Sequence, residues 1–416
     1  MDNRRRHLIG CTLALGAASV VPTWAHDSGS AGHGADAPAA SLRKAARAQL
    51  GTAAAIDGQG RLWVAQVEAA APTDGGPALS NIALAWSLDH GKSWSAAGKV
   101  LAAPEPVEAN GEGRPKLAFG PRGQIYVTFT GPLGKPHTGN IRFARSIDGG
   151  LSFSAPVTVQ RDLAVTGHRF DSIMVDRRGR IFVAWIDKRD LDAARAAKRP
   201  YRGAALYYAV SSDDGASFGP DVRVADHCCE CCRIALTLTA QGDVVAMWRH
   251  IFAPNVRDHA IAVLAPGARP GAVTRVTQDN WRIDACPHHG PSLAFDAKGR
   301  RHQVWFSGGE EHGGLFYAVA GANGRAGKPV RLGGARAEHG EVLAAGETIA
   351  LVWKEFDGQA TRVTVRFSTG GGAWQERALA SNGGASDHPH LVGHGGAILM
   401  VWRTEGEGVI VRKVEA

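Results

Sequence analysis

Short runs of apolar, often β-branched residues recur along the chain, and each run follows a turn that contains a glycine. In six of the seven repeats an aromatic residue follows that glycine by six or seven positions. Repeats of roughly 48 to 63 residues, with short strands between Gly-rich and polar turns, are typical of blades in a radial array. The pattern predicts an all-β protein, a β-propeller of four-stranded blades, with seven blades favoured and six as the alternative. The turn glycines are Gly60, Gly123, Gly179, Gly242, Gly299, Gly346 and Gly396, and the aromatic residues are Phe129, Trp185, Trp248, Trp305, Trp353 and Trp402, with Gln66 in the first repeat.

Three repeats carry the motif Ser-x-Asp-x-Gly-x-x-aromatic, at residues 87–94, 146–153 and 211–218. In such a turn the Ser and Asp side chains can bind backbone amides, the Gly can take a positive φ, and the aromatic ring can pack on the sheet. The motif resembles the Asp-box of the sialidase and BNR-repeat superfamily, over roughly residues 51 to 416. The resemblance implies a sialidase-like propeller. It implies no particular activity, because one fold hosts many functions.

The N-terminus has the layout of an export signal. Arginines at positions 4 to 6 precede an apolar run that extends to Val21, and a small-residue cleavage site ends at Ala25. Arg5-Arg6-x-Leu8-Ile9 is typical of a twin-arginine signal, with an ordinary secretory signal as the alternative. We therefore expect an export signal at residues 1–25, a flexible leader at 26–45, a single propeller domain at 46–416, and a periplasmic or secreted protein.

Composition and charge limit the kinds of binding partner that we expect. The chain has 416 residues, of which 44% are hydrophobic, so it is long enough for one large core. Its formal net charge of +8 is scattered, without the clustered basic and aromatic residues of a nucleic-acid interface. Past the signal, no segment is apolar enough to span a bilayer. We expect a monomer whose partners are a metal ion and, as further candidates, a periplasmic protein or an acidic glycan.

Soft metal ligands recur at the same point of the repeat. Repeat four begins with His227-Cys228-Cys229-Glu230-Cys231-Cys232, and repeat five begins with Cys286-Pro287-His288-His289. The starts of the inner strands lie on one face of a propeller, so we expect these side chains at the mouth of the central channel. Thiolate and imidazole donors select copper(I) or zinc, and the crowded thiolates favour copper. The expected ligands are Cys228, Cys229, Cys231, Cys232, Cys286, His168, His288, His289, His339, His388 and His390.

The four clustered cysteines cannot all reach one ion easily, because adjacent side chains of an extended segment point apart. We expect Cys229 with Cys231, or Cys228 with Cys232 across a turn, to bind together with Cys286 or a histidine. Disulfides are the alternative, since oxidising compartments favour them. The protein would then be a disulfide-braced platform for a partner.

A glycan-processing enzyme is a further alternative that the sialidase resemblance implies. That family clamps a substrate carboxylate with arginines, uses a Tyr activated by Glu as nucleophile, and uses an Asp as acid. The matching candidates are Arg114, Arg169, Arg233, Asp171 and Glu341. The chain departs from the family, however: it lacks the Phe/Tyr-Arg-Ile-Pro segment, it has seven repeats where sialidases have six blades, and no tyrosine follows Tyr317.

The leading hypothesis is an exported propeller that binds a thiophilic metal, copper favoured and zinc the alternative, for metal handling or redox work. Whether it is an enzyme stays open.

Overall fold

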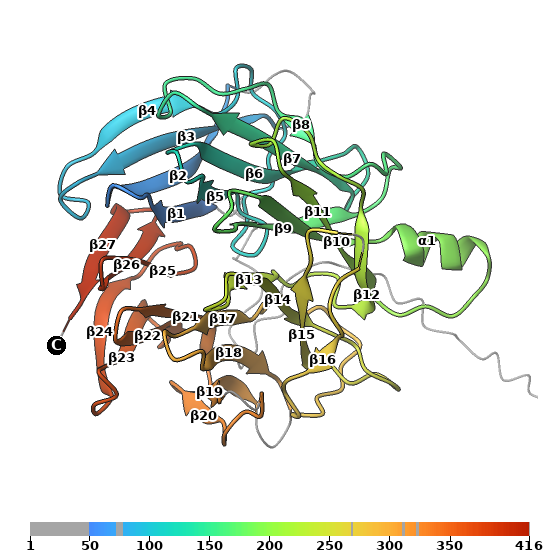
Figure 1. Ribbon diagram of the computed structural model, residues 1–416. Helices are drawn as coiled ribbons and strands as arrows, with labels where there is room; N and C mark the ends of the chain where they lie inside the picture. The colour runs from blue at the N-terminus through green and yellow to red at the C-terminus, as the bar shows by residue number, and fades with distance from the viewer. Residues whose placement is uncertain (1–49, 72–77, 268, 310–312, 322–323, 416) are drawn as a thin grey trace, which may run out of the picture. The chain divides into compact units, whose positions relative to one another are not determined.

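The computed structural model describes residues 50–71, 78–267, 269–309, 313–321 and 324–415. The predicted export signal and leader lie outside these residues, and all the candidate site residues lie inside them. The described chain forms seven antiparallel sheets and one short helix (Figure 1). Among the described residues, no helix is long and apolar enough to cross a membrane.

The first four sheets each contain four strands that are neighbours in chain order, and a single helix interrupts the third. Their strands are β1 (Thr52–Ile56), β2 (Leu62–Ala69), β3 (Ser80–Ser87) and β4 (Ser95–Lys99); β5 (Lys116–Phe119), β6 (Ile125–Pro132), β7 (Gly139–Ser146) and β8 (Val157–Thr158); β9 (His168–Val175), β10 (Ile181–Asp187), β11 (Ala204–Ser211) and β12 (Val222–Cys228), with α1 (Arg189–Ala196) between β10 and β11; and β13 (Ala235–Leu238), β14 (Val244–Arg249), β15 (His259–Leu264) and β16 (Thr274–Arg275).

Two further four-stranded sheets and one three-stranded sheet complete the domain. Their strands are β17 (Ser292–Phe295), β18 (Arg301–Ser307), β19 (Gly314–Ala320) and β20 (Val330–Leu332); β21 (Ala337–Ala345), β22 (Thr348–Phe356), β23 (Thr361–Thr369) and β24 (Gln375–Asn382); and β25 (His390–His394), β26 (Ala397–Thr404) and β27 (Gly408–Val414).

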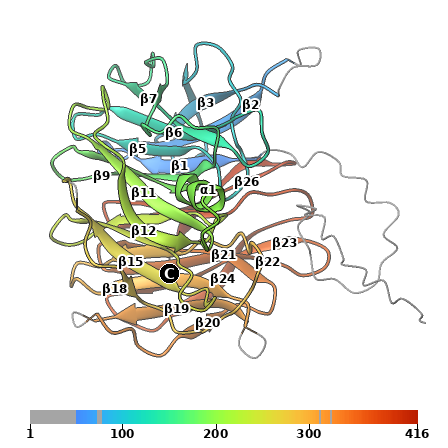
Figure 2. The same ribbon diagram turned by 90° about the vertical axis from the view of Figure 1, so that its right-hand side faces the viewer.

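The seven sheets are the blades of a propeller. The first strand of each sheet contacts the first strand of the next, and β25 returns to β1, so these inner strands close a ring. Figure 1 shows the last blade beside the first, and Figure 2 shows the same blades from the side. The predicted seven-bladed propeller is confirmed, and the six-bladed alternative is wrong.

The repeated glycines and aromatic residues explain why each blade forms. Gly60 and its six counterparts join the first strand of a blade to the second, and all seven have a positive φ, such as 79° at Gly60 and 73° at Gly299. Glycine is the residue that adopts this conformation without a steric cost. The six repeated aromatic residues lie in the second strands and are fully buried, because each blade packs between two neighbours.

The three Ser-x-Asp-x-Gly turns join the third and fourth strands of the first three blades. In the first turn, Ser87 Oγ accepts the Gly91 amide at 2.8 Å, and Asp89 accepts the amide of Ser93 at 2.8 Å and its hydroxyl at 2.6 Å. The other two turns repeat these bonds. Because the strands alternate in direction, these turns lie at the face opposite the starts of the inner strands.

Candidate functional site

The clustered cysteines lie where the chain passes from the third blade to the fourth. Strand β12 ends at Cys228, and a turn at Glu230–Cys231 leads towards β13. The Cys229 amide donates to the Arg249 carbonyl at 2.9 Å, and Glu230 forms an ion pair with Lys188, which precedes α1. Strand β14, which ends at Arg249, and Lys188, the residue before α1, thus both bind this turn.

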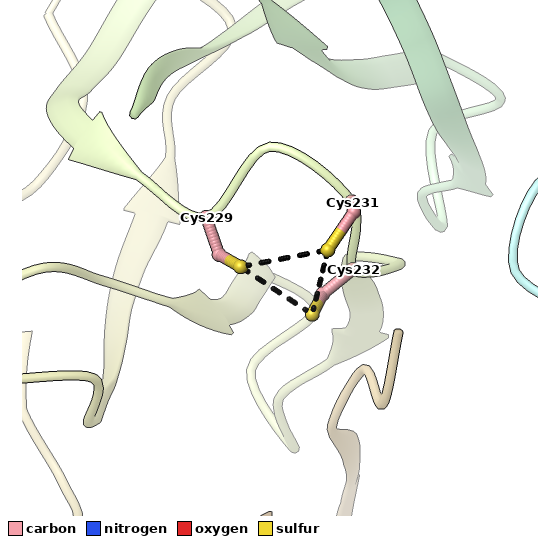
Figure 3. Close-up of side chains that lie close together, drawn as sticks. All are labelled: Cys229, Cys231 and Cys232. Atoms are coloured by element: carbon pink, nitrogen blue, oxygen red, sulfur yellow. Dashed lines mark hydrogen bonds between the residues drawn. The ribbon is translucent and has the colours of Figure 1, made fainter. Parts of the chain in front are cut away.

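Three of these cysteines form a triangle of thiols (Figure 3). The Sγ atom of Cys229 lies 3.8 Å from that of Cys231 and 3.7 Å from that of Cys232, and the last two are 4.0 Å apart. All three residues are at most 4% exposed. The adjacent Cys231 and Cys232 both face inward because the chain turns here; the expectation that neighbouring side chains diverge is therefore wrong at this position.

The remaining cysteines lie outside the triangle. Cys228 directs its thiol to the carbonyl oxygens of Ala225 and Asp226, each at 3.7 Å, so the expected pairing of Cys228 with Cys232 is not formed. Cys286 is exposed, and the Cys231 thiol lowers its pKa. All five cysteines from Cys228 to Cys286 are free thiols.

The charges around the triangle favour a thiolate at Cys229. Hydrogen bonds from the thiols of Cys231 and Cys232, aided by the charges of Arg249 and Arg257, hold the pKa of Cys229 well below its usual range. Arg257 Nη1 lies 3.7 Å from Cys229 Sγ and donates to it. The pKa values of Cys231 and Cys232 are raised because the hydrogen bond of each thiol with Cys229 favours its protonated form. Thiolate is the form that binds metal.

The size of the triangle fits a metal ion. Edges of 3.7 to 4.0 Å place the centre about 2.2 Å from each sulfur, close to the metal–sulfur bond of about 2.3 Å. Cys229, Cys231 and Cys232 would hold a three-coordinate ion without a further donor. A four-coordinate ion would need a fourth donor from outside this group of three.

The axial histidines form a second group around a carboxylate that the sequence analysis did not single out. Glu112 Oε1 lies 3.4 Å from His339 Nδ1 and 3.7 Å from His388 Nδ1. The rings of these two histidines stack at 3.4 Å, and the ring of His289 lies 4.6 Å from that of His339. Glu112 precedes the inner strand β5, so the positional argument used for the cysteines would have found it had carboxylates been included.

Burial and charge set the protonation of this group. Burial alone would raise the pKa of Glu112, but the adjacent charge of Arg233 and the contact with His339 hold it well below its usual range. Burial lowers the pKa of His339 and of His289 to about 3 each, and that of His388 falls well below normal for the same reason. At neutral pH the group is therefore one carboxylate among neutral imidazoles, whose nitrogen lone pairs can bind a metal.

Three predicted histidine ligands lie outside both groups. His168 is buried beside Asp187, with its Nδ1 3.6 Å from the carboxylate. His390 Nδ1 lies 3.0 Å from Glu341, and His288 is exposed. The sequence predicted one donor group. The described residues instead form the thiol triangle and, apart from it, two overlapping sets of donors that share His339.

The arginines proposed to clamp a substrate are each paired with an acidic side chain. Arg114 lies 3.2 Å from Glu341, and Arg233 lies 2.8 Å from Glu112. Arg169 donates to Glu108, with one bond of 2.9 Å. These carboxylates compensate the positive charge that would attract an acidic sugar.

The other parts of the predicted glycosidase site are also engaged. Asp171 accepts hydrogen bonds from Thr128 at 2.6 Å and Thr130 at 3.2 Å, and burial raises its pKa. The chain has five tyrosines. Their hydroxyl groups contact Asp214, Asp226, Asp190, the Ala265 carbonyl and His302. None of these contacts joins a tyrosine to Arg114, Arg169, Arg233 or their acidic partners.

No family model matches the chain, and no curated protein matches it. Solved structures match it in fold. A polysaccharide lyase, an ulvan lyase, has a TM-score of 0.53 and 12% identity, covering 86% of this chain and 90% of that chain. An α-L-arabinofuranosidase from Fusarium graminearum has a TM-score of 0.52 and 12% identity, covering 77% and 92%. The NanB sialidase from Streptococcus pneumoniae has a TM-score of 0.48 and 10% identity, covering 74% and 65%. These neighbours are glycan-processing enzymes, and at such identities the likeness shows the fold alone.

Proposed function

We propose that this protein is an exported metal-handling propeller that holds one soft metal ion on Cys229, Cys231 and Cys232, with copper(I) favoured and zinc the alternative. The observation that carries the proposal is the buried triangle of three sulfurs with edges of 3.7 to 4.0 Å. Soft thiolates select copper(I) and zinc over hard cations. The guanidinium of Arg257 supports the proposal, since it stabilises negative charge on the sulfurs.

Elemental analysis of the purified mature protein tests this proposal. We expect the wild type to hold about one ion per chain more than Cys231→Ser/Cys232→Ser, which lacks two of the three sulfurs. Cys228→Ser is the matched control, because Cys228 is buried in the same segment but lies outside the triangle; it should retain the ion. Equal metal content in all three proteins would eliminate the proposal. Cysteines found paired by mass spectrometry of untreated protein would favour the disulfide-braced platform instead.

A glycan-processing activity is the second candidate. The comparisons favour it, because the neighbours with TM-scores above 0.5 include a polysaccharide lyase and an arabinofuranosidase. In this candidate Arg114, Arg169 and Arg233 would bind an acidic sugar, with Asp171 and Glu341 as the acid–base groups. The ion pairs of the three arginines weigh against it, since a substrate carboxylate would have to displace Glu108, Glu112 or Glu341.

The second candidate is tested with fluorogenic glycosides, including sialosides and arabinofuranosides, and with acidic polysaccharides. Arg169 is the most exposed of the three arginines, at 19% of its side chain, so its replacement is the informative one. Turnover that Arg169→Ala abolishes would establish the activity. Lack of turnover across the panel would retire it.

A further inference from the structure

The imidazole and carboxylate group around Glu112 lies apart from the thiols and offers different donor atoms. We propose that Glu112, His339 and His388 form a second metal site, which takes a borderline divalent cation of the zinc class. The proposal goes beyond the thiol site and does not depend on it. Zinc is a candidate ion for both sites, so the two sites are distinguished by their donor atoms.

The distances between the donor atoms fit one ion. Glu112 Oε1 lies 3.4 Å from His339 Nδ1 and 3.7 Å from His388 Nδ1. Ligands bound tetrahedrally at about 2.0 to 2.2 Å lie about 3.3 to 3.6 Å from each other. The two distances to Glu112 are thus within a few tenths of an ångström of this spacing, and all three donor atoms lie within 4.8 Å of one another. The two rings are stacked, with 18° between their planes, so at least one ring has to turn out of the stack before both nitrogens can bind the same ion.

Two of the donor atoms have unmet bonding capacity. The Nδ1 atoms of His339 and His388 are buried, and within the described part of the chain neither has a hydrogen-bond partner. Buried polar atoms are normally paired, and those that are not need an explanation such as an ion. A cation bound between them and Glu112 would satisfy both nitrogens at once.

The surrounding residues already hold the ligands in place. The Nε2 atom of His339 lies 3.6 Å from Glu338, which gives the carboxylate–histidine–metal order common at zinc sites. Glu112 is fixed by the amides of Arg233 at 2.8 Å and Gly290 at 2.9 Å. His339 also has a φ of 51°, a strained conformation for a residue other than glycine, and such strain concentrates at functional sites.

The donor set determines the class of ion. Imidazole nitrogen with carboxylate oxygen suits zinc and similar divalent ions, whereas copper(I) prefers the sulfurs of the thiol triangle. His289, whose ring lies 4.6 Å from that of His339, belongs to a neighbouring set of donors with Glu338 and His339.

Cobalt(II) titration distinguishes the two sites, because thiolate ligands add an intense charge-transfer band that nitrogen and oxygen ligands lack. The protein to use is Cys229→Ser/Cys231→Ser/Cys232→Ser. We expect it to bind one Co²⁺ per chain with visible d–d bands and no thiolate band. If this variant does not fold, the wild type with one equivalent of Ag⁺ on its thiols replaces it. In this background, His339→Gln and His388→Gln should weaken binding at least about 100-fold, while the exposed His288→Ala should leave it unchanged.

Two results would overturn the proposal. One is the absence of Co²⁺ binding in both thiol-blocked proteins. The other is equal binding by His339→Gln, His388→Gln and His288→Ala. If Co²⁺ binds only to free thiols, the second site is refuted while the thiol site stands. If the thiols bind no soft metal but the nitrogen site binds Co²⁺, the thiol site is refuted and the second site stands.

Discussion

Arg233 binds Glu112 twice, through its backbone amide and through Nη1, both at 2.8 Å. Arg233 directly follows Cys232, and Glu112 is the carboxylate between His339 and His388. The ion pair therefore connects the turn that carries the thiols to the imidazole group. Both side chains are buried, at 8% and 3% exposed, so each charge is stabilised by the other.

Breaking this pair should destabilise the protein strongly. Arg233→Ala leaves the Glu112 carboxylate buried without its main counter-charge, so we expect the free energy of unfolding to fall by about 3 to 5 kcal/mol. Urea unfolding followed by tryptophan fluorescence measures the loss. Lys99→Ala is the control: it removes an exposed pair with Glu68, and it should change the stability by less than about 1 kcal/mol. Similar losses in both variants would contradict the role given to Arg233.

Buried neutral histidines predict a stability that rises with pH. The folded pKa values of His289 and His339 are lowered to about 3, whereas an unfolded histidine titrates near about 6.5. Below that value the unfolded chain binds protons that the folded chain does not, so stability is complete above pH 6.5 and is lost as the pH falls. We expect a loss of about 1.4 kcal/mol per pH unit for each such histidine between about pH 6 and pH 4.

Urea unfolding from pH 7 to pH 4, with a chelator present, tests this dependence. His339→Gln should reduce the slope of the unfolding free energy by about one proton, and His288→Ala should not change it, because His288 is exposed. A slope that is the same in His339→Gln and the wild type would show that His339 titrates normally.

The Asp-box turns allow a matched pair of glycine variants. Gly215 has a φ of 80°, and a Cβ atom added there would lie 2.3 Å from the Phe143 ring. Gly149 has a φ of 74° and has nothing within 4 Å of an added Cβ. Gly149→Ala should cost only the conformational penalty of about 1 kcal/mol, whereas Gly215→Ala adds a clash and should cost about 3 kcal/mol. Thermal unfolding of the two variants checks the difference, and equal costs would refute the clash.

The propeller could be predicted because its blades repeat one local pattern. A turn glycine with positive φ and a buried aromatic residue, such as Gly179 and Trp185, recur at fixed spacing, and both are local requirements of a blade. The helix Arg189–Ala196 likewise has a local cause, because it is rich in alanine, the residue with the highest helix propensity. Such features depend on neighbours in sequence.

The site could be predicted only in part, because it depends on a turn and on distant residues. The cysteines lie just before the inner strand β13, and the turn at Glu230–Cys231 brings Cys232 beside Cys231, which an extended strand would not do. Glu112 was missed because its two histidines are more than 200 positions away, so only the closed ring brings them together.

The role of Cys286 separates the two candidate metals. Cys286 is exposed and lies outside the group of three sulfurs, so it would have to move inward to complete a four-sulfur zinc site and would remain free beside a three-sulfur copper(I) site. If copper(I) is the bound ion, X-ray absorption should count three sulfurs in the wild type and in Cys286→Ser alike.

In the metal-free protein Cys286 should react with iodoacetamide first, because it is exposed and its pKa is lowered by the Cys231 thiol. Copper(I) loading should leave that reaction unchanged. If the bound ion is zinc, the metal-loaded protein should instead show a fourth sulfur, and Cys286 should be protected from iodoacetamide.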